Sequence, residues 1–220
     1  MLYFILALNL SGWDILTAVL GYLCAMAVGI VSHEVAHAFV AHKCGDDTAK
    51  LMGRVSFNPF AHLDPMGMLM FLFVGFGWAK PVPVNELNFR NFKRGQRLVS
   101  LAGIVTNLVL AFIFSGLYYF FFPYLISHSN LFLNFVGYFL LFAFAINISL
   151  AIFNLFPIYP LDGFNFLRSF LRPTNKFVLF MESYGSLILI LLFITSAFDY
   201  VYSFFLNLVE QGFFAFWGLF

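Results

Sequence analysis

Charged residues are so sparse along this chain that they divide it into long apolar runs. Runs 98–127 and 129–161 contain no charged residue, and runs 14–43 and 177–197 contain very few. A helix needs about 20 residues to cross a hydrocarbon core of roughly 30 Å, and all four runs reach that length. The pattern therefore predicts four membrane-spanning helices.

Three other apolar segments are shorter or less regular. Segment 66–79 is uncharged but has only fourteen residues, is rich in glycine and precedes two prolines, so it favours a re-entrant or β-hairpin element over a helix. We expect a further short or interfacial helix in the tail, 199–220, and a partial insertion at 1–10. The expected fold is an all-α polytopic membrane protein with about four to six transmembrane helices, and residues 1–220 form a single membrane-embedded domain.

The composition supports a lipid bilayer as the solvent. Hydrophobic residues make up 62% of the chain and charged residues 10%, against about 25% charged in soluble domains. The net charge of +1 provides no electrostatic argument for binding nucleic acid. Cys24 and Cys44 form no CxxC motif, so neither a redox site nor a cysteine zinc site is expected. The first thirteen residues carry no Lys or Arg, so no secretory signal is predicted.

The basic residues predict an orientation in the membrane. All eleven Lys and Arg lie in two windows, 43–97 and 168–176, while the turn at 123–130 has none. Cytoplasmic loops carry the excess of Lys and Arg, so both windows are expected in the cytoplasm and the turn outside. The four spans then alternate in direction without conflict.

The motif that suggests chemistry is His33-Glu34-Val35-Ala36-His37, which reads HExxH. Residues four apart in a helix lie on one face, so both imidazoles can reach one metal ion while Glu34 lies beside it as a general base. On a surface helix the same letters can be accidental. Here the motif follows about eighteen apolar residues of a predicted span, where an ionisable residue costs roughly 2.5–3.5 kcal/mol, which favours the metal interpretation.

Zinc with one exchangeable water requires a third protein ligand. The candidates are His42, His62, Asp64, His128 and Asp162. His128 lies in the outside turn, and His42 is turned away from the metal-binding face. His62 and Asp64 lie in a plausible loop. We prefer Asp162, because it lies six residues before a basic window, as does the second histidine of the motif, and so on the same side of the membrane.

Two asparagines are further candidates. Asn154 precedes Pro157 and Pro160, which should break the helix and leave polar groups free to bind a substrate strand or a developing oxyanion. An interhelical hydrogen bond is an equally good interpretation of Asn154. For Asn107, which lies further inside its span, the interhelical bond is favoured.

Taken together, HEVAH and the downstream Asn-Leu-Phe-Pro-Ile-Tyr-Pro-Leu-Asp-Gly at 154–163 resemble the site-2 protease family of intramembrane zinc metallopeptidases. Other stretches within residues 20–170 resemble its compact bacterial branch; they are 53–59, 62–67, 77–85 and 97–107.

The resemblance implies that His33, His37 and Asp162 bind one Zn²⁺ and that Glu34 is catalytic. It also implies hydrolysis of peptide bonds in or near transmembrane segments of other membrane proteins. The expected location is a bacterial inner membrane, with the active site toward the cytoplasm.

Two other functions are compatible with the same residues. One is a non-proteolytic membrane protein with a structural zinc site, which a fourth protein ligand such as His62 would favour. The other is a metal or proton transporter, but the outer half of the predicted spans has almost no ionisable residues for a path through the bilayer.

Overall fold

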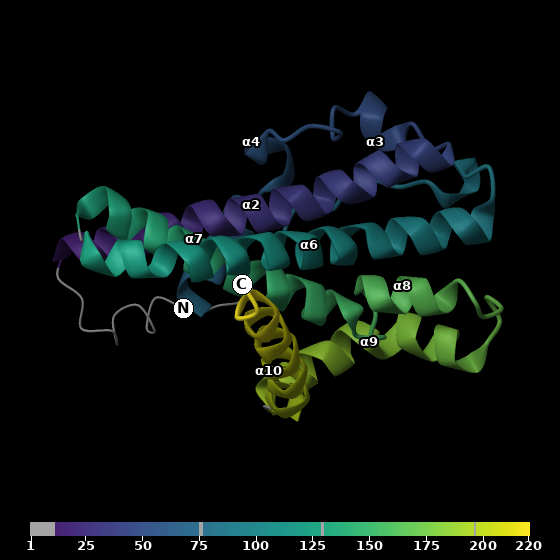
Figure 1. Ribbon diagram of the computed structural model, residues 1–220. Helices are drawn as coiled ribbons and strands as arrows, with labels where there is room; N and C mark the ends of the chain where they lie inside the picture. Colours follow the sequence, from purple (N-terminus) through teal and green to yellow (C-terminus); the bar gives the residue numbers. More distant parts are fainter. Residues whose placement is uncertain (1–11, 75–76, 129, 196) are drawn as a thin grey trace.

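The computed structural model describes residues 12–74, 77–128, 130–195 and 197–220, so the partial insertion expected at 1–10 lies outside the described residues. In chain order the helices are α2 (Gly12–Cys44), α3 (Thr48–Leu51), α4 (Pro59–His62), α5 (Pro65–Val74), the 3₁₀ helix η1 (Glu86–Asn88), α6 (Phe92–Ser127), α7 (Leu131–Leu155), α8 (Asp162–Arg168), α9 (Lys176–Ile194) and α10 (Ala197–Trp217) (Figure 1). The described residues contain no β-strand, which confirms the all-α prediction.

Four of these helices are long and apolar enough to cross a membrane, as predicted. They are α2, the Phe92–Leu125 part of α6, α7 and α9. The turn between α6 and α7 is shorter than the predicted 123–130, because α6 continues through Pro123 to Ser127. Proline inside a membrane helix is tolerated where neighbouring groups satisfy the backbone.

The core lies where α2, α6 and α7 run side by side (Figure 1). Small residues allow the close approach: Ala18 and Ala25 of α2 are fully buried against α7 residues such as Phe142. A Cβ atom at Gly21 would lie 2.9 Å from the backbone nitrogen of Phe139 on α7. Membrane helices pack through such small residues, because lipid offers no hydrophobic gain for helix association.

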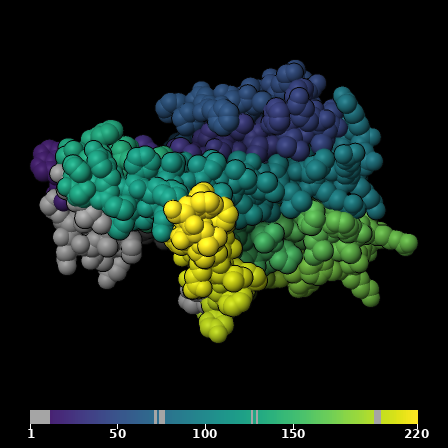
Figure 2. Space-filling model, in the orientation of Figure 1, coloured from purple at the N-terminus to yellow at the C-terminus, as the bar shows by residue number. Residues whose placement is uncertain are grey.

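The tail forms a helix, α10, as expected. Figure 1 shows it crossing the long helices rather than running along them, and Figure 2 shows it standing out from the bundle. The Trp217 indole stacks on Phe112 with 4.5 Å between ring centroids, and its Nε1 donates to Ser115 Oγ at 2.9 Å. Aromatic packing and one partly buried hydrogen bond therefore hold α10 against α6.

The prediction for segment 66–79 is wrong in one respect, because Pro65–Val74 forms the helix α5. Asp64 Oδ1 accepts a hydrogen bond from the Gly67 amide at 2.9 Å. Such a cap satisfies a backbone N–H group at the start of the helix, and the prediction from length and glycine content did not include it. After this segment the chain runs beside the residues that precede α5, because Leu63 and Ala79 form an isolated antiparallel bridge. The β-hairpin form is not confirmed, since no strand occurs in the described part of this segment.

A buried carboxylate anchors the loop beyond this return. Asp46, at the end of α2, accepts hydrogen bonds from the Asn85 amide at 2.7 Å and from Asn88 Nδ2 at 2.8 Å. Burial opposes its ionisation, but the hydrogen bonds from Thr48, Asn88 and Asn85 hold the pKa of Asp46 below its ordinary value. The segment that carries η1 is thereby fixed beside the cytoplasmic end predicted for α2.

Candidate active site

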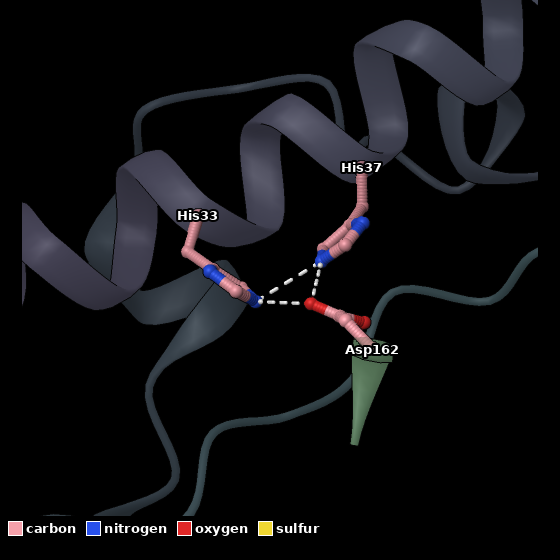
Figure 3. A group of neighbouring side chains, drawn as sticks. All are labelled: His33, His37 and Asp162. Carbon is pink, nitrogen blue, oxygen red and sulfur yellow. Dashed lines mark hydrogen bonds and ion pairs between the residues drawn. The ribbon is translucent and has the colours of Figure 1, made fainter. Parts of the chain in front are cut away.

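His33 and His37 of α2 and Asp162 of α8 meet at a single point (Figure 3). The two Nε2 atoms are 3.0 Å apart. Asp162 Oδ2 lies 3.2 Å from Nε2 of His33 and 3.1 Å from Nε2 of His37. Both histidines are buried, so the three ligand-type atoms converge inside the protein. The structure thus brings together the three residues that the sequence analysis preferred.

The break after α7 places the carboxylate. The helix ends at Leu155, and α8 begins with Asp162 as its first residue. The next residue, Gly163, lies so close to the end of α7 that a Cβ atom there would be 2.2 Å from the Leu155 carbonyl oxygen. Only glycine permits this approach, so Gly163 allows α8 to begin directly beside the end of α7.

The far side of each imidazole is bonded to α6. His33 Nδ1 lies 2.6 Å from Asn107 Oδ1, and His37 Nδ1 lies 2.8 Å from the Val99 carbonyl oxygen. The Asn107 amide orientation is set by its own Nδ2, which donates to the Gly29 carbonyl and to Asn147 Oδ1. Both partners are therefore acceptors, and each Nδ1 must carry the proton.

The protonation pattern tests whether zinc fits. With the protons on Nδ1, both neutral rings present Nε2 lone pairs to each other and to Asp162 Oδ2, and a cation between them resolves the clash of three acceptors. Bond lengths of about 2.0–2.1 Å in a tetrahedron separate ligand atoms by roughly 3.3 Å, close to the observed 3.0–3.2 Å.

One face of α6 supports the histidines. Val99, Gly103 and Asn107 are spaced four residues apart and lie toward the HExxH motif of α2. Asn107 does form interhelical hydrogen bonds, as favoured from the sequence, but its partner His33 was not foreseen. In the sequence, the spacing of four residues between Val99, Gly103 and Asn107 indicates that they share one helix face. It does not indicate that this face meets α2.

Gly103 supplies the space for the His33 ring. A Cβ atom at Gly103 would lie 2.4 Å from His33 Cε1, closer than any real contact. We expect Gly103→Ala to displace the ring and lower zinc affinity roughly 10–100-fold, the range seen when support of a ligand is lost. Zinc titration of the purified protein measures this change.

Gly212→Ala is the matched control, because a Cβ atom there meets nothing within 4 Å. It should bind zinc like the wild type. Equal zinc affinity in both variants would show that the ring does not depend on the space at Gly103.

Glu34 lies beside the three ligand-type atoms in a cavity of about 320 Å³. Its Oε2 accepts a hydrogen bond from the Val82 amide at 3.0 Å. Asn154 lines the same cavity, and its Nδ2 donates to the Leu150 carbonyl at 3.0 Å. A carboxylate and a cavity beside three potential metal ligands suit hydrolysis by a metal-activated water.

The other candidate ligands lie elsewhere. His62 is fully buried with Nε2 on the Ser56 carbonyl at 2.8 Å, and Asp64 caps α5. His42 pairs with the Asp47 carboxylate. His128 follows the end of α6. Among the described residues the group at the site has three members, as in catalytic rather than structural zinc sites.

Comparisons with known proteins agree with this geometry. The model of Peptidase family M50 matches residues 123–195. The chain is 40% identical over 177 residues to the "Putative zinc metalloprotease YwhC" of Bacillus subtilis, covering 80% of this chain and 81% of that protein. It is 30% identical over 186 residues to the "Putative zinc metalloprotease Rip2" of Mycolicibacterium smegmatis, covering 79% and 68%. No solved structure matches it significantly.

The fold and the site define a polytopic membrane protein with three residues, His33, His37 and Asp162, that could hold one metal ion. The chain belongs to peptidase family M50, the site-2 protease family. It is an integral membrane protein and a zinc metalloprotease with Zn²⁺ as its cofactor, as the sequence predicted. This assignment overrules the structural-zinc and transporter alternatives.

Proposed function

We propose that this zinc metalloprotease cuts peptide bonds in or near transmembrane segments of other membrane proteins. The observation that carries the proposal is the position of the site. Its two histidines and Glu34 lie within α2, a helix long enough to span a membrane, and line a cavity beside that helix. A site carried by such a helix supports a substrate that is itself embedded in the membrane.

In this proposal His33, His37 and Asp162 hold one Zn²⁺, which when bound polarises the scissile carbonyl and makes water more acidic. Glu34 accepts the proton of the attacking water at a carboxylate oxygen. It then donates that proton to the nitrogen of the leaving amine, so the carboxylate is regenerated.

Asn154 has the role of stabilising the developing oxyanion in this proposal. Its amide already lines the cavity, and a backbone carbonyl in its own helix accepts one of its two protons. The second amide proton can be donated to a substrate oxygen, where one such donor contributes substantially to rate.

The basic windows support a cytoplasmic site. Both the HExxH motif and Asp162 lie a few residues from Lys and Arg clusters, and cytoplasmic loops carry that excess. We propose that residues 1–220 form one domain in a bacterial inner membrane and that water enters the cavity from the cytoplasm.

A substrate helix must unwind before it can be cut, because its carbonyls are bonded internally. We expect a single-span substrate with two glycines in the cytoplasmic half of its span to be cleaved roughly 30-fold faster than an all-leucine span. Each glycine costs about 1 kcal/mol in a helix, so two make unwinding about 2 kcal/mol easier. Zinc-loaded protein and substrate are reconstituted in vesicles, and mass spectrometry maps the cut.

The control substrate carries the same glycine sequence in a soluble loop outside the span. Cleavage confined to that loop, with intact spans in both membrane substrates, would contradict the proposal while leaving the metalloprotease assignment in place.

A further inference from the structure

The hydrogen bond between Val82 and Glu34 has an unusual setting. Val82 lies between Pro81 and Pro83, which have no N–H group and a restricted φ. The Val82 amide is therefore the single backbone donor of this tripeptide, and it points at Glu34 Oε2 over 3.0 Å. Pro81 and Val82 also line the cavity of the site.

Arg54 holds the same peptide group from the other side. Its Nη2 donates to the Lys80 carbonyl at 2.5 Å and to the Pro81 carbonyl at 3.2 Å. The Pro81 carbonyl and the Val82 N–H belong to one planar peptide unit, in which oxygen and hydrogen point in opposite directions. One peptide unit thus lies between a guanidinium at its oxygen and a carboxylate at its hydrogen.

The local fold places Arg54 for this contact. Gly53, two residues after the end of α3, has a φ of +69°, a conformation that favours glycine, and the Arg54 amide donates to the Ala49 carbonyl at 2.8 Å. The returning chain is fixed as well, because the Lys80 amide donates to the His62 carbonyl at 2.8 Å. Arg54 is half-buried as a residue, with its Nε shielded from solvent, while its two hydrogen bonds to the carbonyls lie at an exposed position.

We propose that Arg54 is a positioning residue for proteolysis, which fixes the Pro81–Val82 peptide so that the Val82 amide holds the carboxylate of Glu34. The guanidinium polarises the peptide, and hydrogen bonds in such a chain strengthen one another. One carboxylate oxygen is then occupied and the other is free to exchange a proton. The inference rests on the proposed role of Glu34 as the base.

The test combines kinetics with hydrogen exchange in the full-length, zinc-loaded protein. Arg54→Met keeps the apolar stem and removes the donors. We expect kcat to fall roughly 10–100-fold, the cost of losing a supporting contact, with zinc content and KM near wild type. Exchange at Val82, the single backbone amide of residues 81–83, should accelerate about tenfold or more, with or without zinc.

Arg54→Lys and Arg172→Ala complete the design. Lysine can reach a carbonyl with its ammonium, so Arg54→Lys should recover part of kcat and part of the Val82 protection. Arg172 is exposed between α8 and α9, and its loss should change nothing. If Arg54→Met does not fold, Arg54→Leu, which also lacks donors, carries the same expectations for kcat and exchange.

Wild-type kcat and unchanged Val82 exchange in Arg54→Met, beside an inactive Glu34→Gln, would overturn this inference alone. An active Glu34→Gln would instead overturn the proposed role of Glu34 and this inference together, even if Val82 exchange accelerates in Arg54→Met.

Discussion

Replacement of Glu34 by glutamine is expected to lower the rate of proteolysis at least about a thousandfold, within the range attributed to a general base. The amide of glutamine cannot accept the proton of water at neutral pH. Its carbonyl oxygen can still accept the hydrogen bond of the Val82 amide, so the local structure should persist. The measurement is initial cleavage rate on a single-span substrate, with zinc content determined on the same sample.

Glu182→Gln is the matched control for this variant. Glu182 lies on α9 and forms a partly exposed ion pair with Arg168, whose loss costs about 1 kcal/mol or less. It should retain wild-type activity. Activity in Glu34→Gln within tenfold of the wild type, at full zinc content, would remove Glu34 from its role. The inactive, zinc-loaded protein would also serve to trap substrates.

Asp162→Asn is expected to have an equally large effect through zinc binding. The change removes the charge of the one anionic group among the three ligand-type atoms while keeping its shape. We expect zinc affinity to fall about a hundredfold or more, beyond the loss caused by a supporting residue alone, and proteolysis to disappear at limiting zinc. Competition with a fluorescent chelator measures the affinity.

Asp64→Asn tests the alternative ligand with the same substitution. An asparagine oxygen can still cap α5 at the Gly67 amide, so neither stability nor zinc affinity should change. Loss of zinc from Asp64→Asn, with normal zinc in Asp162→Asn, would exchange the roles of these two aspartates.

The membrane spans could be read from the sequence because lipid imposes a local rule. A hydrocarbon core penalises each charged residue by itself, so the positions of Lys and Arg bound α2, α6, α7 and α9 without knowledge of their neighbours. The HExxH motif is equally local, since helical geometry alone brings His33 and His37 to one face. Depth in the membrane then favoured Asp162 over the other candidates.

Segment 66–79 shows where such local rules fail. Its length and glycine content argued against a helix, but Pro65–Val74 forms the helix α5. Asp64 caps that helix, and Gly67 lies in close contact with the Trp78 backbone. A Cβ atom at Gly67 would lie 2.0 Å from the Trp78 carbonyl oxygen, so that glycine serves chain packing rather than a break. The contact partner lies eleven residues away, outside any pattern of helical or strand period.

The sequence by itself therefore determined the four spans, the three candidate metal ligands and the zinc metalloprotease class. Only the tertiary structure decided what surrounds those residues. These features are the Val99 carbonyl, the space at Gly103, the amide of Asn107 and the hydrogen bonds from Arg54 to the chain beside Glu34. The physical reason is that a backbone carbonyl, an absent side chain and a planar peptide have no chemical signature of their own. They act on the site only because one particular face of α6 lies against α2 and because the chain at Ala79 and Lys80 runs beside His62 and Leu63. Both arrangements are set by packing over the whole bundle.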